Sequence, residues 1–356
     1  MAPRTVRSAA TRFRPARGAL LLLALIAGSS SAGEAVALFE DDAALPIRIE
    51  APLTTLRRQR SDTEYLSGFL YYTDSGGVER SLDLKLRARG RYRRQRDTCS
   101  FPPVRLNFRK KQVEGTPFAG VDKLKLVTHC RRSGKYEQNV LEEYLAYRIL
   151  NLLTDRSFRV RLLQIDYVDN ERGGDTDRRY AFLIEDDDLL ARRLGTTRIE
   201  VHSVLRDALQ SEQAALVSVF QYLIGNTDFS MIAGPKDDLC CHNVVLFAGD
   251  NDQYLPVPYD FDFAGLVNAR YAAPNPRLKI RRVTTRMYLG FCSYNAYVEG
   301  ALSQILAQRE QIMGLVDTVP GMEKRTRETA RRFLAGFYEA MSEPGGAEKH
   351  LLRRCS

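Results

Sequence analysis

The order of the hydrophobic periodicities constrains the fold more than any other feature of this sequence. In the first half of the chain apolar and polar residues alternate, as in 80–93, where every second residue is apolar. This pattern is typical of a β-strand with one buried face. From residue 189 onward apolar residues recur every three to four positions, which indicates helices. Strands followed by helices predict an α+β fold.

The same patterns place the individual elements. We expect an antiparallel sheet in the first half, followed by a hairpin, with strands at 64–72, 80–93, 104–108, 124–127, 160–168 and 180–184. Predicted helices are 139–153, 189–194, 211–224, 295–317 and 322–342. The sequence therefore predicts a β-rich N-terminal region with one helix at 38–188 and an α-rich C-terminal region at 189–356.

The first 32 residues have the layout of a secretory signal. Five arginines precede the apolar run 19–27, and small residues follow it, with cleavage expected after residue 32 or 37. The apolar run is too short for the ~20 residues of a membrane span, so we expect a cleaved leader, with an uncleaved anchor as the alternative. We expect an exported protein, periplasmic or extracellular, with no transmembrane span after signal removal. The leader also supplies five of the positive charges behind the formal net charge of +9.

Export favours disulfides over free thiols for the six cysteines. We expect Cys99 to pair with Cys130, because they bracket two predicted strands, and one of Cys240 and Cys241 to pair with Cys292. Zinc is the alternative, because His129-Cys130 and Cys241-His242 are adjacent His/Cys pairs, although neither has C-x₂-C spacing.

Three short polar motifs flank apolar stretches between residues 222 and 270. They contain Asp228, Asn243 and the pair Asp260 and Asp262. A hairpin of 244–247 with 254–257 would bring Asn243 near Asp260. Carboxylate and amide oxygens suit Mg²⁺ or Mn²⁺, so these residues form a candidate cation site. The alternative is that each aspartate serves only a local Asx turn.

The order of these motifs resembles the spore-coat CotH kinase-like family and, more distantly, the HipA-like kinases. The resemblance covers roughly residues 65–317 and is carried by G-N-x-D at 225–228, H-N at 242–243 and Y-D-x-D-x-x-G at 259–265. It implies a two-lobed protein-kinase-like fold with an antiparallel β-rich N-lobe and an α-rich C-lobe. It also implies Mg²⁺-dependent ATP binding and phosphoryl transfer to a protein or small acceptor.

The resemblance also assigns roles to residues. Asp228 becomes the catalytic acid, and Asn243 and Asp260 become metal ligands with Asp262 in support. Residue spacing departs from the HipA-like pattern, because Asp228 and Asn243 are fifteen positions apart. The nucleotide-binding residues carried over are Arg89 beside a glycine, a phosphate-contacting cation, Glu142 or Glu143 on a helix, and Glu185 at the hinge. The cation is Arg105, Lys123 or Lys125.

Residues 85–111 form a basic run, with eleven basic side chains against Asp97 alone. Such a run indicates an anionic partner. It supports the alternative function, a non-catalytic, pseudokinase-like cell-envelope binding protein. Nucleic acid is a less suitable partner, because Tyr92 is the only aromatic residue within the densest part of the run.

Overall fold

The computed structural model describes residues 1–2 and 36–356, and the description below is confined to them. The predicted signal sequence therefore lies outside the described residues, apart from its first two positions. The first described element is a short 3₁₀ turn at Ala37–Phe39, whose Leu38 and Phe39 are buried.

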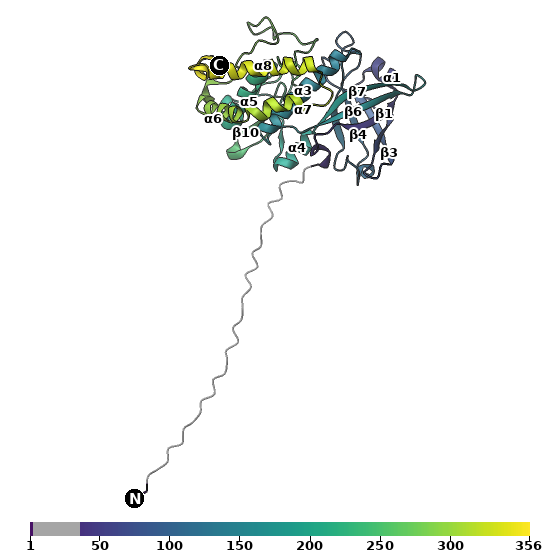
Figure 1. Ribbon diagram of the computed structural model, residues 1–356, viewed down its shortest axis with the longest axis horizontal. Helices are drawn as coiled ribbons and strands as arrows, with labels where there is room; N and C mark the ends of the chain where they lie inside the picture. Colours follow the sequence, from purple (N-terminus) through teal and green to yellow (C-terminus); the bar gives the residue numbers. More distant parts are fainter. Residues whose placement is uncertain (3–35) are drawn as a thin grey trace. The chain divides into compact units, whose positions relative to one another are not determined.

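A closed seven-stranded barrel occupies one side of the described body, and most of the helices lie on the other (Figure 1). Neighbouring strands pair antiparallel except β1 and β6, which pair in parallel. In their order around the barrel the strands are β1 (Leu45–Ala51), β2 (Leu66–Thr73), β3 (Glu79–Ala88), β4 (Val104–Phe108), β5 (Lys123–Val127), β7 (Asp175–Ile184) and β6 (Val160–Asp169).

This barrel corrects the predicted fold class. The expected two-lobed protein-kinase-like fold has an open antiparallel sheet in its N-lobe, whereas here the sheet is mixed and closed. The reason is β1, which the sequence analysis did not include. Ile47 on this strand is opposite Tyr72 of β2 and also opposite Ile165 of β6, so β1 joins the two edges that would otherwise stay open.

The barrel interior is filled by the alternating residues that predicted its strands. On β3 the side chains of Leu82, Leu84 and Leu86 are all buried. Leu106 of β4 and Leu124 of β5 are fully buried against them, which gives the barrel its own apolar core. Two short helices, α1 (Leu53–Gln59) and α2 (Lys110–Val113), lie between the strands.

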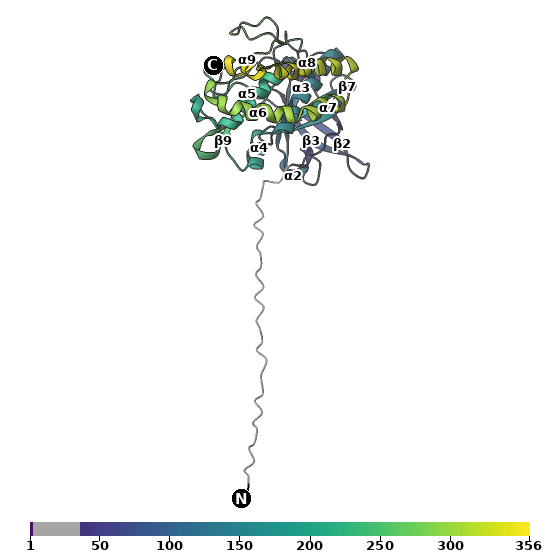
Figure 2. The same ribbon diagram turned by 60° about the vertical axis from the view of Figure 1, so that its left-hand side comes forward.

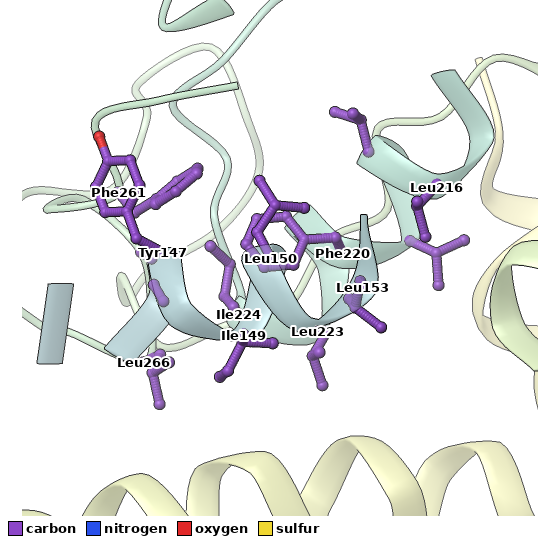
Figure 3. Close-up of a cluster of buried hydrophobic side chains, with 14 of the residues drawn as sticks. Tyr147, Ile149, Leu150, Leu153, Leu216, Phe220, Leu223, Ile224, Phe261 and Leu266 are labelled. Carbon is purple, nitrogen blue, oxygen red and sulfur yellow. The ribbon is translucent and has the colours of Figure 1, made fainter. Parts of the chain in front are cut away.

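The second core forms where α3 (Gly134–Leu153) packs against α5 (Ser211–Ile224). Figure 3 shows Tyr147 and Leu150 of α3 beside Phe220 of α5 and Phe261, all of them buried. α5 also packs against α6 and α8 (Figure 2). The remaining helices are α4 (Asp187–Leu194), α6 (Asn295–Ala307), α7 (Arg309–Thr318), α8 (Lys324–Ser342) and α9 (Gly346–His350). The helix expected at 295–317 is thus divided into α6 and α7.

A three-stranded antiparallel sheet carries the polar motifs. Its strands are β8 (Arg198–Ile199), β9 (Val244–Ala248) and β10 (Tyr254–Pro258), with β9 in the centre. The register places Val244 opposite Pro258, which confirms the predicted hairpin.

All six cysteines are paired in three disulfides, consistent with an oxidising compartment. Cys99–Cys130 is confirmed, with 4.6 Å between the Cα atoms. The predicted link from Cys240 or Cys241 to Cys292 is wrong, because those two pair with each other. Cys292 instead pairs with Cys355, since backbone hydrogen bonds of Cys292 and Gly290 with Ser356 hold the C-terminus beside it. Within residues 36–356 no helix combines the length and apolar character needed to cross a bilayer.

Candidate functional site

The loop that carries Asp228 begins where α5 ends. Gly225 closes the helix in a left-handed conformation, and a Cβ there would lie 2.7 Å from the ring of Phe333, so both backbone and space require glycine. Asn226 is fully buried, and its side chain accepts a hydrogen bond from the Asp228 amide at 2.9 Å. This Asx turn belongs to Asn226 and leaves the carboxylate of Asp228 available for other contacts.

The β9–β10 hairpin brings Asn243 and Asp260 to the same end of the small sheet. The amide of Tyr259 donates to the carbonyl oxygen of Asn243 at 3.0 Å, one residue beyond the last strand pair. Both Asn243 and Asp260 have positive φ, 53° and 61°. Such backbone is uncommon for residues other than glycine and clusters at functional sites. The expected proximity of Asn243 and Asp260 is therefore confirmed.

Asp228 is held by the two residues that precede β9. Oδ1 of Asp228 lies 2.7 Å from Nε2 of His242, and the Asn243 side-chain amide donates to Oδ2 at 3.1 Å and to the Asp228 carbonyl at 2.7 Å. The hydrogen bond with Asp228 raises the pKa of His242 despite burial, and the charges of Asp228 and Asp260 add to this effect. A protonated His242 would orient the Asp228 carboxylate.

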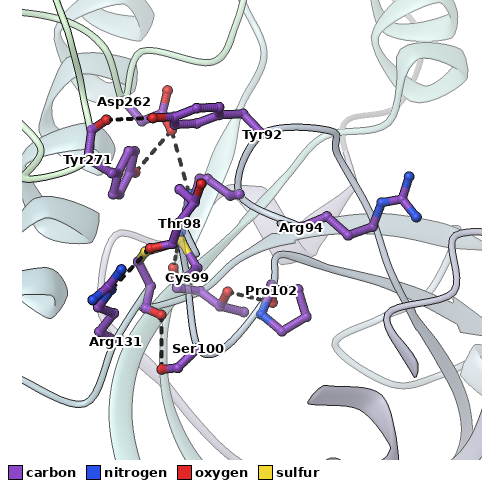
Figure 4. Close-up of a disulfide and its surroundings, with 12 residues drawn as sticks. Tyr92, Arg94, Thr98, Cys99, Ser100, Pro102, Arg131, Asp262 and Tyr271 are labelled. Atoms are coloured by element: carbon purple, nitrogen blue, oxygen red, sulfur yellow. Dashed lines mark hydrogen bonds and ion pairs between the residues drawn. A yellow bond between two sulfur atoms is a disulfide. The ribbon is translucent and has the colours of Figure 1, made fainter. Parts of the chain in front are cut away.

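A buried ionic group lies behind this loop. Nη1 of Arg93 is 3.9 Å from Glu143 of α3 and 3.9 Å from Asp262, and all three residues are less than a tenth exposed. The hydroxyl of Tyr271 donates to Asp262 at 3.0 Å (Figure 4). Tyr92, on the loop between β3 and β4, donates its hydroxyl to the backbone carbonyl of Tyr271 at 3.0 Å (Figure 4). The loop between β3 and β4 is thus fastened to the segment after Asp262, and the Cys99–Cys130 disulfide anchors its far end.

Burial dominates the protonation of the two carboxyl groups that face Arg93. It raises the pKa of Glu143 well above its ordinary value, and the charges of Asp262 and Asp260 raise it further. Burial and the charge of Asp260 raise the pKa of Asp262 to about 7, against the opposing effect of Arg93. Glu143 therefore favours its neutral form near neutral pH, and Asp262, which is partly ionised there, supplies the negative charge opposite Arg93.

Asp260 and Arg89 are half-buried charged residues of this region that keep free hydrogen-bonding capacity. Asp260 is half-buried; its backbone N–H donates to the hydroxyl of Tyr147 at 2.8 Å. No described residue makes a hydrogen bond or ion pair with its carboxylate. Arg89 is half-buried too, and its buried Nε has no partner among the described residues. Burial lowers the pKa of Arg89, and the charge of Asp260 opposes this effect.

We call Asp228, His242, Asn243, Asp260 and Arg89, together with the buried Arg93, Glu143 and Asp262, the carboxylate cluster. The sequence analysis gave His242 no role beside Asp228, did not separate Arg93 from its basic run, and left Glu142 and Glu143 as alternatives. Glu143 could have been chosen over Glu142, because it lies one helical turn before Tyr147, on the face that reaches Asp260. Arg93 gave no such signal within its basic run.

Four predicted nucleotide-binding residues have other partners in the structure. Arg105 pairs with Asp186 at 3.0 Å and Lys125 with Asp187 at 2.8 Å. The remaining two are Glu185, held by Arg193 at 2.7 and 2.9 Å, and Glu142, which accepts from Asn139 at 2.9 Å. Lys125 nevertheless borders the cluster, since its Nζ lies 5.0 Å from the ring of Tyr259.

The described residues contain no group of three His, Cys, Asp or Glu side chains arranged to hold a metal ion. The zinc alternative is therefore not supported, and the cysteines of both His/Cys pairs are oxidised. Mg²⁺ has a different requirement, because it is usually bound by one or two protein oxygens together with water and substrate phosphates. The free carboxylate of Asp260 and the amide oxygen of Asn243 fit that requirement.

A scan against family models and a search of curated proteins found no match to this chain.

Proposed function

We propose that the carboxylate cluster binds a nucleoside triphosphate together with Mg²⁺ or Mn²⁺ and transfers a phosphoryl group to a hydroxyl acceptor. One observation carries the proposal. Asp228 and Asn243 are fifteen residues apart in sequence yet in direct contact. Asn243 precedes β9 and Asp260 follows its partner strand β10, and the carboxylate of Asp260 has no partner among the described residues. An amide, a free carboxylate and a second, oriented carboxylate are the groups that phosphoryl transfer needs.

Each residue has a distinct role in this proposal. Asp260 and Asn243 would hold the cation, which when bound neutralises charge on the phosphate oxygens. Arg89, with its unpartnered Nε, would donate to those oxygens. Asp228 would take the proton of the acceptor hydroxyl. At the same time the hydroxyl oxygen bonds to the γ-phosphorus, and the bond from the γ-phosphorus to the β–γ bridging oxygen breaks. The nucleoside diphosphate leaves with that electron pair.

We further propose that the protein acts after export. The three disulfides support this location, and so does the arginine-rich, apolar N-terminal sequence.

The competing role, an envelope protein that binds an anionic partner through residues 85–111, gains no support from the geometry. Much of this basic run is already neutralised within the fold. Its ion pairs are Arg91–Asp238, Arg94–Asp62, Arg105–Asp186, Arg109–Asp83 and Lys110–Asp122, and Arg93 is buried. Lys85, Arg96 and Lys111 remain exposed without ion pairs among the described residues.

Calorimetric titration with ATP, in Mg²⁺ and separately in Mn²⁺, tests the proposal. Wild type should bind, and Asp260→Asn should abolish the metal-dependent part of the affinity, because it removes the free carboxylate without changing its shape. Asp228→Asn should retain most of the binding and lose transfer, since its role is in the transition state. Asp175→Asn, an exposed change on β7, is the matched control. Absence of heat with wild type in both metals, or unchanged affinity in Asp260→Asn, would refute the assignment.

A further inference from the structure

The segment that follows the cluster has an unusual charge composition. Between Asp262 and Glu299 the sequence contains no acidic residue. The basic residues in this stretch are Arg270, Arg277, Lys279, Arg281, Arg282 and Arg286. A stretch of one charge sign produces a local positive potential that attracts anions.

Four of these basic residues are free to act on a ligand. Arg277, Lys279, Arg281 and Arg282 are exposed, and none of their side chains makes a hydrogen bond or ion pair with a described residue. We call residues 277–282 the basic segment. Leu278 and Ile280, which alternate with the first three cations, are half-buried. The apolar side chains are therefore partly covered while the charges remain in solvent.

The basic segment lies beside Asp228. Just before it, the side-chain amide of Asn275 donates to the carbonyl of Thr227 at 3.3 Å, and Thr227 is the neighbour of Asp228. Just after it, Arg286 donates to the carbonyl of Leu223 on α5 at 3.2 and 3.3 Å. The first anchor joins the segment to the loop that carries Asp228, and the second joins it to the last turn of α5, which leads into that loop.

This position indicates the acceptor rather than the nucleotide as the ligand. In the proposed function the phosphates lie with Asp260 and Arg89, whereas the acceptor hydroxyl approaches Asp228. Cations distributed over six residues also exceed what one phosphate group requires. They suit a chain with several negative charges near the hydroxyl that reacts.

A membrane surface is the less suitable partner. Segments that bind lipid surfaces usually combine basic residues with exposed apolar side chains that enter the bilayer. The exposed large apolar residues of the described chain, such as Phe69, Leu205 and Leu239, all lie outside the basic segment. Its own apolar residues are half-buried, so it offers charge without an insertion surface.

We propose that the basic segment is the docking strip for the acceptor and that the acceptor is an acidic polypeptide, with Asp, Glu or phosphorylated residues near its reactive hydroxyl. This inference rests on the proposed function, which identifies Asp228 as the residue that the acceptor hydroxyl approaches. Its test does not, because binding of an acidic peptide is measured without nucleotide or metal.

The experiment compares two variants that each lose four positive charges. The first carries Arg277→Gln, Lys279→Gln, Arg281→Gln and Arg282→Gln. The control carries Lys85→Gln, Lys111→Gln, Lys123→Gln and Lys135→Gln, all exposed lysines without ion pairs among the described residues. Fluorescence anisotropy with a labelled serine peptide flanked by glutamates measures affinity at low and moderate salt, with a neutral peptide of equal length beside it. Melting curves verify that both variants are folded.

We expect the first variant to lose at least tenfold in affinity for the acidic peptide and to show a weaker salt dependence, while the control changes by less than about threefold. Equal losses in the two variants would mean a non-specific charge effect and overturn the inference. A loss confined to anionic phosphatidylserine vesicles, with peptide affinity unchanged, would make a membrane the partner and also overturn it. The nucleotide titration is read separately, so failure of one proposal is distinguishable from failure of the other.

Discussion

Glu142 on α3 gives a direct test of how the core beneath the site is built. It is 7% exposed, and burial raises its pKa to about 8, although a hydrogen bond from Asn139 and the charge of Arg270 oppose the shift. In the unfolded chain the ordinary value is 4.5. Between these two values the folded protein keeps a proton that the unfolded chain releases. The contribution to stability is therefore complete below pH 4.5 and is lost as pH rises toward 8.

The magnitude follows from the same two values. One pKa unit corresponds to about 1.4 kcal/mol, so holding Glu142 protonated at pH 7 costs on the order of 3 kcal/mol and at pH 5 less than about 1 kcal/mol. Glu142→Gln keeps the shape and the oxygen that accepts from Asn139 but has no proton to lose. We expect it to raise the free energy of unfolding by about 3 kcal/mol at pH 7 and to have little effect at pH 5.

Urea unfolding at the two pH values, followed by far-UV circular dichroism because the chain has no tryptophan, measures this difference. Glu299→Gln on α6 is the matched control, since Glu299 is exposed and has no ion pair among the described residues. A gain of equal size at both pH values would show that the effect does not come from ionisation. No gain at pH 7 would show that the carboxyl group is not buried as described.

Two further predictions concern the buried ion pairs and the disulfides. Arg93→Met should lower the free energy of unfolding in urea by about 3–5 kcal/mol, because it leaves the buried carboxylate of Asp262 without its cation. The exposed Arg96→Met should change it by less than about 0.5 kcal/mol, and equal effects would place Arg93 at the surface. Non-reducing peptide mapping should recover a Cys292–Cys355 peptide, whereas a Cys240–Cys292 peptide would contradict the structure. Replacing both Cys292 and Cys355 by serine should lower the free energy of unfolding by about 4 kcal/mol, because the disulfide closes a long loop, with a separation of 63 residues.

The extent to which sequence predicted the fold depended on whether each signal was local. Strand β4 at Val104–Phe108 and helix α5 at Ser211–Ile224 have the predicted bounds, because periodicity and capping are written in neighbouring residues. Barrel closure is not local. β1 contains Pro46, yet the alternation of Ile47 and Ile49 with charged residues is a local strand signal that the sequence analysis missed. Its parallel pairing with β6, more than a hundred residues away, has no sequence signal of its own.

The site shows the same division. The β9–β10 hairpin predicted that Asn243 and Asp260 would meet, since a short hairpin fixes which residues are opposite. The contact of His242 with Asp228 depends on how residues 229–241 fold back, and the cysteine beside His242 suggested zinc instead. Arg93 was read as part of a surface run, although a buried arginine needs an acidic partner from another element. Neither Glu143 nor Asp262 could be assigned to it from spacing.

The strongest argument for a ligand at the cluster comes from comparing the ion-pair partners of its carboxylates with those of buried carboxylates elsewhere in the fold. Asp169 is paired with Arg57 at 2.7 Å, Asp187 with Lys125 at 2.8 Å, and Glu185 with Arg193 at 2.7 Å. A half-buried charge without such a partner is costly. Asp260 is in this position, on positive-φ backbone, although Arg89 lies nearby with a buried Nε that has no partner among the described residues. A purely structural pair would close to hydrogen-bonding distance, as the other three do. In the proposed function this arrangement is explained by a ligand that brings a cation for Asp260 and anionic oxygens for Arg89, and a metal-bound phosphate would supply both.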